Sequence, residues 1–183
     1  MLKEKQEANA GKKRHGAVMA GVPFIVSIII FSGILFLILS PFEIHLQTFE
    51  AHLVQKILNA IGTSTRATEN PTQFFAENYL VEVSPLCSGL LELILLIAAV
   101  VATPDATWKK KIKGIILGGG LLFVFNLLRM TISIQQLIHT SLEFAEFTHG
   151  VLFRAVLILG FALIYGVWVH SPRIKMWASQ KGI

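Results

Sequence analysis

Hydrophobic residues along this chain gather into four long runs separated by more polar segments. The runs cover residues 17–41, 86–103, 114–129 and 149–169, and the first contains no charged residue. A helix needs about 20 apolar residues to cross the ~30 Å hydrocarbon core of a bilayer. The third run is short, so either flanking lysines extend their stems to the membrane surface or the helix continues past Arg129. The pattern therefore predicts four transmembrane helices.

The longest polar segment, residues 42–85, contains a pattern of its own. Its first part has apolar residues three and four positions apart, which is typical of an amphipathic helix lying at the membrane surface or over a bundle; they are Leu46, Phe49, Leu53, Ile57 and Ile61. Its second part is rich in turn-forming residues, which indicates a loop with at most a short extended piece at residues 79–83. The other predicted segments are a basic tail (1–16), a loop (104–113), an external segment (130–148) expected to be helical in part, and a second tail (170–183).

Composition agrees with a membrane protein and leaves little room for a soluble domain. Hydrophobic residues make up 54% of the 183 residues and charged residues only 15%, a balance that a soluble domain does not show. The first run is too long for the apolar core of a signal peptide, and no small-residue cleavage site clearly closes it. We therefore expect a retained signal-anchor helix and a single membrane domain over residues 1–183, with an all-α fold.

The basic residues predict how the helices are oriented. Of the sixteen Lys and Arg, five lie in residues 1–16, four in 104–113 and three in 170–183, whereas acidic residues concentrate in the segments between the other ends of the runs. Positively charged loops stay on the cytoplasmic side. Both termini are therefore predicted to be cytoplasmic in a multi-pass protein of the cell membrane. The net charge of +5 reflects this topology, and no basic face with interleaved aromatics indicates nucleic-acid binding.

Three chemically capable residues fall at the same predicted depth. Cys87, the only cysteine, opens the second run, Arg129 ends the third and His149 opens the fourth. At 1.5 Å rise per residue, Cys87 and Arg129 both lie roughly 24 Å above the inner boundary. Helix bundles build sites from side chains on facing helices, so these three residues are candidates for one site at the outer face.

Such a set of residues is suited to nucleophilic acyl transfer. A thiolate is the attacking species, and a nearby imidazole or cation favours it over the thiol. His149 is placed to exchange protons with a leaving group, and Arg129 to stabilise a developing oxyanion or anchor an anion. Each residue also has an ordinary interpretation: a packing cysteine, an arginine reaching the head groups and a histidine at the interface. The spacing of these three residues alone does not decide between a catalytic site and the ordinary roles.

Two further charges lie inside the predicted spans. Glu92 follows Cys87 by five residues and Arg154 follows His149 by five. Charges inside a membrane tend to pair, so an ion pair between them would brace the second span against the fourth. A direct role in chemistry is the alternative. No metal is expected, because His45, His52 and His139 lack completing ligands, and no cofactor motif is present. Residues 118–120 are three consecutive glycines that would permit close helix approach.

The sequence around these residues resembles a known family. The run Pro85-Leu86-Cys87-Ser88-Gly89-Leu90, the run Asn126-Leu127-Leu128-Arg129 and the pair His149-Gly150 occur in that order. Together they resemble the exosortase/archaeosortase family of membrane cysteine transpeptidases, in which Cys-Ser-Gly opens one span, Asn-x-x-Arg ends the next and His or Arg opens the one after. The resemblance covers residues from about 83 to 155, and the chain resembles a short core of the family.

The resemblance implies a role in processing exported proteins. Family members are taken to recognise a C-terminal motif followed by a transmembrane helix and a basic tail, to cut outside the membrane, and to transfer the new carboxyl terminus to a lipid or another acceptor. Carried onto this sequence, Cys87 would form a thioacyl intermediate, His149 would be the general acid and base, and Arg129 would position the acyl centre. Ser88, Gly89 and Asn126 would support them.

A non-catalytic membrane protein, either a transporter subunit or an assembly scaffold, is the rival interpretation. Under it Glu92 and Arg154 would serve transport or packing, and Cys87 would fill space. Transport sites favour the middle of the bilayer, whereas the three candidate residues are predicted near one rim. The predicted depth therefore favours the enzyme.

Overall fold

The computed structural model describes residues 22–104, 106–140, 148 and 153–180, with the side chains of the last helix described for residues 155–170. The chain is mostly helical. A helix over residues 22–39 leads through the short η1 (Ser40–Phe42) into α2 (Glu43–Ala60), and three strands follow. The rest of the chain contains α3 (Leu90–Ala102), α4 (Trp108–His139) and α6 (Phe153–Gln180).

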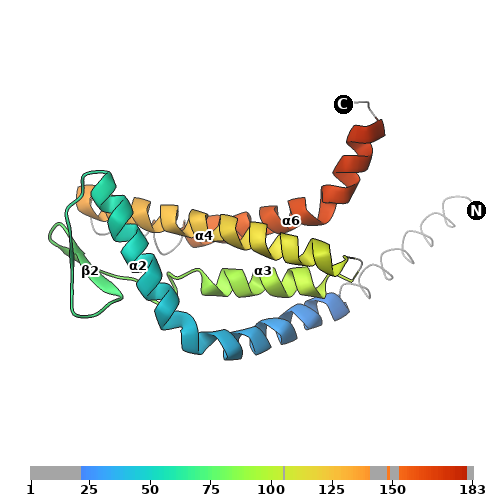
Figure 1. Cartoon of the computed structure of the whole chain (residues 1–183), viewed down its shortest axis with the longest axis horizontal. Helices are drawn as coiled ribbons and strands as arrows, with labels where there is room; N and C mark the ends of the chain where they lie inside the picture. Colours follow the sequence, from blue (N-terminus) through green and yellow to red (C-terminus); the bar gives the residue numbers. More distant parts are fainter. Residues whose placement is uncertain (1–21, 105, 141–147, 149–152, 181–183) are drawn as a thin grey trace, which may run out of the picture.

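Helices α3, α4 and α6 form a bundle in which each helix packs against the other two. Figure 1 shows the three running side by side, with α2 crossing α4 near one end of the bundle. Part of the bundle core is made by the buried residues Leu96, Val100 and Leu122, against which aromatic residues of α6 pack. The bundle is thus held by large apolar side chains from all three helices.

Glycines on α4 allow the bundle helices to approach closely. A Cβ atom added at Gly118 would lie 3.0 Å from side-chain atoms of Ile164 and Leu96, and one added at Gly119 would lie 3.0 Å from Leu93. Gly120, the third glycine of the run, has nothing within 4 Å of such an atom. Two of the three glycines therefore lie where the neighbouring helices approach closely and a Cβ atom would be tightly crowded, as predicted.

Two of the described helices are long and apolar enough to cross a membrane, namely Val22–Ala60 and Trp108–His139. The apolar stretch of the first is residues 22–39, whose side chains are largely exposed, and Phe24 stacks on Tyr165 of α6 with ring centroids 6.4 Å apart. Leu90–Ala102 and Ala155–His170 are shorter apolar helices. Four spans and cytoplasmic termini therefore remain predictions for this mostly helical chain.

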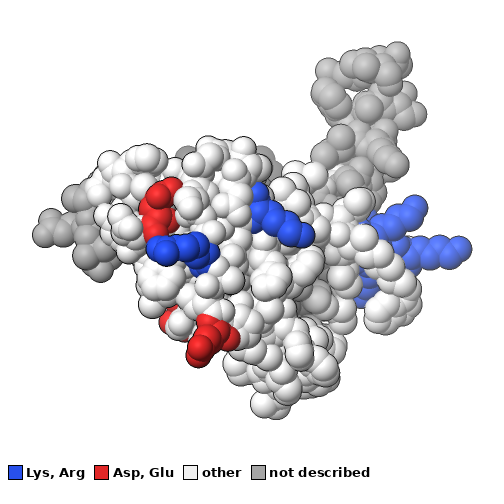
Figure 2. Space-filling view, turned by 60° about the vertical axis from the view of Figure 1, so that its left-hand side comes forward, with Lys and Arg blue, Asp and Glu red and all other residues white. Residues whose placement is uncertain are grey.

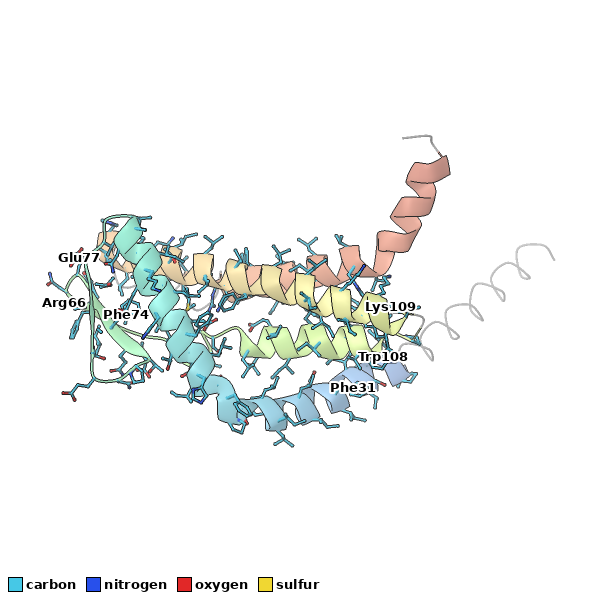
Figure 3. All side chains as sticks on the ribbon, in the orientation of Figure 1. Phe31, Arg66, Phe74, Glu77, Trp108 and Lys109 are labelled. Carbon is cyan, nitrogen blue, oxygen red and sulfur yellow. The ribbon has the colours of Figure 1, made fainter. Side chains whose placement is uncertain are left out.

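The segment expected to be a loop contains a β-sheet, so the all-α prediction needs correction. Strands β1 (Thr65–Ala67), β2 (Gln73–Ala76) and β3 (Tyr79–Glu82) form an antiparallel sheet in that order. Phe74 and Ala76 alternate with exposed neighbours and are fully buried. They pack with Val54 and other apolar residues of α2 and α4, and Phe74 lies between the sheet and α2 (Figure 3).

Helix α2 lies where the amphipathic pattern predicts a helix, but its fully buried face is shifted from the predicted apolar one. Leu53 and Ile57 of the apolar series are partly buried and pack against the core, whereas Phe49 and Ile61 are exposed. The buried side is instead the stripe Gln47, Glu50, Ala51, Val54 and Leu58. The helix packs its stripe against α4 and the sheet. Since the stripe includes two polar residues, its burial could not be read from hydrophobic spacing.

The helix ends are not those of the predicted runs. Helix α4 begins at Trp108 and continues past Arg129 to His139, as one of the two alternatives for the short third run predicts, and Met130 and Ile134 of the extension are buried against α2 and the sheet. Helix α3 begins at Leu90, three residues after Cys87. The extension of α4 is held by an apolar surface that only the folded sheet and α2 provide.

The lysine-rich beginning of α4 and the charged residues of the sheet region lie at opposite ends of the molecule. Figure 3 places Trp108 and Lys109, at the beginning of α4, at the opposite end from Arg66 and Glu77 of the sheet region. Figure 2 shows a projecting group of Lys and Arg side chains apart from the Asp and Glu side chains visible on the same face. The lysine-rich segment therefore lies at one end of the molecule, and the sheet and the crossing helix α2 lie at the other.

Candidate functional site

Cys87 lies in a tight turn between the sheet and α3. Its backbone N–H donates to the carbonyl of Ser84 at 2.8 Å, which closes the turn. Val83, just before it, is buried and donates its N–H to the carbonyl of Thr72 at 3.0 Å, so the sheet region fixes where the turn begins. The Cys87 side chain is half-buried, and the Ser84 hydroxyl donates to its Sγ at 3.3 Å. The thiol is therefore held in place while part of it stays accessible.

Two side chains of α4 converge on the backbone carbonyl of Cys87. Nδ2 of Asn126 donates to this oxygen at 2.9 Å, and Nη2 of Arg129 donates to the same oxygen at 2.9 Å. Residues three apart share one helix face, and both side chains are 2% exposed. Hydrogen bonds from charged donors are the stronger kind. The Asn-x-x-Arg spacing thus lets a single helix hold the turn that carries the thiol. We call these two hydrogen bonds, from Asn126 and Arg129 to the Cys87 carbonyl, the clamp.

Gly89 and Ser88 form the entry into α3. Gly89 has a left-handed backbone (φ 66°), and a Cβ atom there would lie 3.1 Å from Cγ of Asn126. Glycine adopts this conformation without steric cost, and its missing side chain leaves the space that Asn126 occupies. The Ser88 hydroxyl donates to the carbonyl of Pro85 at 3.0 Å and lies 3.5 Å from the carboxylate of Glu43. Both residues therefore shape the turn.

A carboxyl group from α2 completes the described part of the site. Oε1 of Glu50 accepts a hydrogen bond from Nδ2 of Asn126 at 3.1 Å. The Glu50 side chain is fully buried, and its Oε2 has no hydrogen-bond partner among the described residues. Nε of Arg129 likewise has none there. Three segments that are distant in sequence, namely α2, the turn at Cys87 and α4, thus meet in one polar cluster.

Burial governs the protonation of Glu50, which lies on the helix outside the expected spans. It raises the pKa of this carboxyl from the ordinary 4.5 to about 8, although the Asn126 hydrogen bond and the positive charge of Arg129 act in the opposite direction. The Cys87 group raises the pKa of Glu50 further when it is charged. Removal from water disfavours the charged form of an acid, so Glu50 is mostly neutral at pH 7.

The remaining predicted residues are placed only in part. His149 lies outside the described residues, and so does the side chain of Arg154, which leaves the predicted pairing of Arg154 with Glu92 a prediction. Glu92 lies in the first turn of α3 and lines a small cavity of about 30 Å³ together with Ser88, Gly89 and Asn126. The structure therefore brings Cys87, Ser88, Gly89, Asn126 and Arg129 together, with Glu92 beside them.

Sequence reasoning missed Glu50, which it treated as one more external acid. The signal available was its position within the series Gln47, Glu50, Ala51, Val54 and Leu58, which recurs on one helix face. A carboxyl group on an otherwise packed face is unusual, because buried charges are rare unless they are paired. Spacing alone could not identify Asn126 as its partner, since the two residues are 76 positions apart.

The described geometry can support thiol chemistry. The Arg129 guanidinium places a permanent positive charge beside the Cys87 turn, and nearby cations favour a thiolate. Its Nε is buried and has no hydrogen-bond partner among the described residues, so one donor of the guanidinium is uncommitted there. Among the residues described, no cluster of His, Cys, Asp and Glu could hold a metal ion.

Comparison with known families supplies an independent finding. The family model described as transmembrane exosortase (Exosortase_EpsH) matches residues 11–166. The matched region includes the Cys87 turn, both clamping residues of α4 and the His149 position. No curated protein and no solved structure matches the chain.

Proposed function

The chain belongs to the transmembrane exosortase family, and from this premise we propose that it is a membrane cysteine endopeptidase and transpeptidase of the exosortase/archaeosortase type. It cleaves a C-terminal sorting signal of exported proteins through a thioacyl intermediate. The observation that carries this proposal is the pair of 2.9 Å hydrogen bonds from Asn126 and Arg129 to the Cys87 carbonyl. A side chain that serves only to fill space would not need its backbone held by a buried amide and a buried guanidinium.

The clamp supports catalysis by fixing the position of the nucleophile. The Cys87 thiolate attacks the carbonyl carbon of the scissile peptide bond, so that a C–S bond forms and negative charge develops on the carbonyl oxygen. Arg129 stabilises this charge, because a fixed donor in a poorly hydrated site loses little energy to reorganisation. The tetrahedral species then collapses, the C–N bond breaks, and the leaving amine takes a proton from His149, the role that the family resemblance implies for this residue.

The second half of the reaction releases the substrate. An acceptor, which is a lipid group or another nucleophile, loses its proton to His149 and attacks the thioester carbonyl. The C–S bond breaks, and the Cys87 thiolate is restored. Water in place of the acceptor would give hydrolysis by the same steps. The substrates are exported proteins with a C-terminal motif, a transmembrane helix and a basic tail. The site works at the outer face of the cell membrane, opposite the lysine-rich loop.

A substrate-processing experiment tests this proposal. In cells that make the chain and a tagged exported protein with such a C-terminal signal, the signal is lost when the chain is intact. Cys87→Ala and Cys87→Ser should both abolish this loss, provided that immunoblots show equal amounts of each variant in the membrane. If processing continues with Cys87→Ala, the thiol is not the nucleophile, and the transporter or scaffold interpretation takes precedence.

A further inference from the structure

Glu50 is a buried carboxyl group that the thioacyl chemistry above does not use. It comes from α2, whereas the other described groups of the site come from α4 and the turn before α3. Its exposed fraction is 0%, and one of its two oxygens has no hydrogen-bond partner among the described residues. An ionised carboxylate in such a place would be costly, because burial removes the water that stabilises the charge.

The charges around Glu50 do not give it a dedicated counter-ion. Among the described residues, the titratable groups that act on it are Arg129 from α4 and Cys87 from the turn. Nη2 of Arg129 is committed to the Cys87 carbonyl, and the hydrogen bond that Glu50 accepts comes from the neutral amide of Asn126. One guanidinium therefore faces two groups that could become anions, the Glu50 carboxyl and the Cys87 thiol.

A single positive charge cannot stabilise two neighbouring anions equally well. If Glu50 ionised, its negative charge would oppose a thiolate at Cys87 and draw on the same guanidinium. If Glu50 keeps its proton, Oε1 still accepts from Asn126, Oε2 carries the proton, and Arg129 remains free to favour the thiolate. The neutral form of Glu50 thus preserves both the clamp and the attraction between Arg129 and the Cys87 thiolate.

We infer that Glu50 is a positioning residue that works in its protonated form, holding Asn126 against the Cys87 carbonyl while leaving the positive charge of Arg129 to the Cys87 thiolate. This inference rests on the proposed function, in that it takes the thiolate as the reactive species. It is supported by the raised pKa of Glu50, about 8, to which charge on Cys87 contributes. Interaction between two titrating sites is mutual, so a negative charge on Glu50 must also disfavour the thiolate form of Cys87.

The single cysteine makes this inference measurable without a substrate. Iodoacetamide alkylates thiolates, and in the purified full-length chain it can react with no thiol other than Cys87. Alkylation rates are measured from pH 6 to pH 10 for the unmodified chain and for Glu50→Gln, which keeps an oxygen for Asn126 but cannot ionise. We expect similar rates below pH 7 and a higher rate in Glu50→Gln from pH 8 to pH 9, by up to about threefold, since half a pKa unit corresponds to at most about threefold in thiolate.

Two further variants distinguish the effect of the Glu50 charge from a general disturbance of the structure by the substitution. Glu50→Asp keeps a titratable acid and should retain the slower alkylation at high pH. Glu69→Gln removes a carboxyl from the exposed loop between β1 and β2 and should follow the unmodified chain at every pH. Superimposable profiles for the unmodified chain and Glu50→Gln would overturn the inference, as would slower alkylation of Glu50→Gln at pH 9.

The unmodified chain gives a second measurement that does not depend on a variant folding. Its alkylation rate should rise with pH less steeply above pH 8 than a single ionisation allows, because Glu50 loses its proton there. A profile that fits one ionisation throughout would contradict the inference. The readout is independent of peptide transfer. A failed processing test with Cys87→Ala would therefore remove the proposed function, whereas the alkylation profiles decide the role of Glu50.

Discussion

The backbone carbonyl of Cys87 is the atom on which the described polar side chains of the site converge. Asn126 and Arg129 both donate to it, and Glu50 accepts from Asn126 in turn. Each of the three side chains is at most 2% exposed. Leaving one buried polar group without its partner costs more than a typical hydrogen bond gains. The cluster is therefore expected to respond as a unit when any one member is changed.

Arg129→Lys is expected to impair processing although it keeps the positive charge. Lysine lacks the planar, rigid group of donors that arginine provides, and losing a hydrogen bond from a charged donor costs about 1.5–3 kcal/mol. Processing of a tagged substrate should therefore slow by about 10- to 100-fold. Arg66→Lys, at an exposed position of β1, is the matched control. Processing by Arg129→Lys within about twofold of the unmodified chain would mean that charge alone suffices.

Glu50 is also expected to make stability depend on pH. Its pKa is about 8 in the folded chain and 4.5 in the unfolded one, so the folded state binds its proton more tightly. Its proton binding stabilises the folded chain fully below pH 4.5, and this stabilisation is lost as pH rises through 8. Glu50→Gln should remove this pH-dependent part of the free energy of unfolding. Thermal unfolding of the purified chain, followed by tryptophan fluorescence at several pH values, should show a smaller decline from pH 5 to pH 9 in the variant; equal declines would contradict the assignment.

At the scale of elements, α2 and the sheet hold the site together from outside the helix bundle. Helix α2 contributes Glu50 on the same face as Val54 and Leu58, which pack with Phe74 of β2 and with Leu127 and Met130 of α4. Leu127 and Met130 flank Arg129 in sequence. The apolar core beside the site and the polar cluster within it are therefore built from the same helices, and disturbing one should displace the other.

The two adjacent phenylalanines of β2 allow this coupling to be tested. Phe74 is fully buried, whereas Phe75 is 36% exposed on the other face of the sheet. Phe74→Ala should destabilise the chain by about 3–5 kcal/mol, the usual cost of emptying a large buried site, and should also reduce processing. Phe75→Ala should cost much less. Comparing thermal unfolding and substrate processing for the two variants checks the expectation, and equal effects would show that the sheet does not pack as described.

At the scale of the whole molecule, the site and the lysine-rich loop lie toward opposite ends. The turn at Cys87 follows the sheet, and the lysines cluster where α4 begins, at the far end of the bundle (Figure 1). The helix over residues 22–39 carries exposed apolar side chains, as expected for a surface that faces lipid. In the proposed orientation, the positive-inside rule puts the lysines in the cytoplasm and the Cys87 turn outside.

Cysteine labelling in intact cells tests this orientation. In a Cys87→Ser background, Glu69→Cys is expected to react with a membrane-impermeant maleimide added from outside, because Glu69 is exposed beside the sheet. Thr107→Cys, at the exposed N-cap of α4, should react only after the membrane is opened. Labelling of Thr107→Cys in sealed cells would reverse the assignment of the two faces.

The family, the helical character and the residues of the Cys87 turn could be predicted from the sequence. Apolar runs identify helices because membrane solubility depends on composition, and Cys-Ser-Gly and Asn-x-x-Arg are local patterns that carry their own spacing. Strand β3 falls on the extended piece predicted at residues 79–83. Strands β1 and β2 were missed because strands of three or four residues are too short for an alternating pattern to stand out from a loop. Their conformation is stabilised by packing on α2 and α4.

By itself, then, the sequence determined that this is a mostly helical membrane protein of the exosortase family, with Cys87 and Arg129 in the family's motifs. Only the tertiary structure decided how far α4 continues past Arg129, that Cys87 lies in a turn before α3, and that Glu50 joins the site from α2. The physical reason is that local composition and spacing are properties of one segment. The burial of Glu50 and its hydrogen bond to Asn126 arise from segments distant in sequence, and they exist only when those segments pack together.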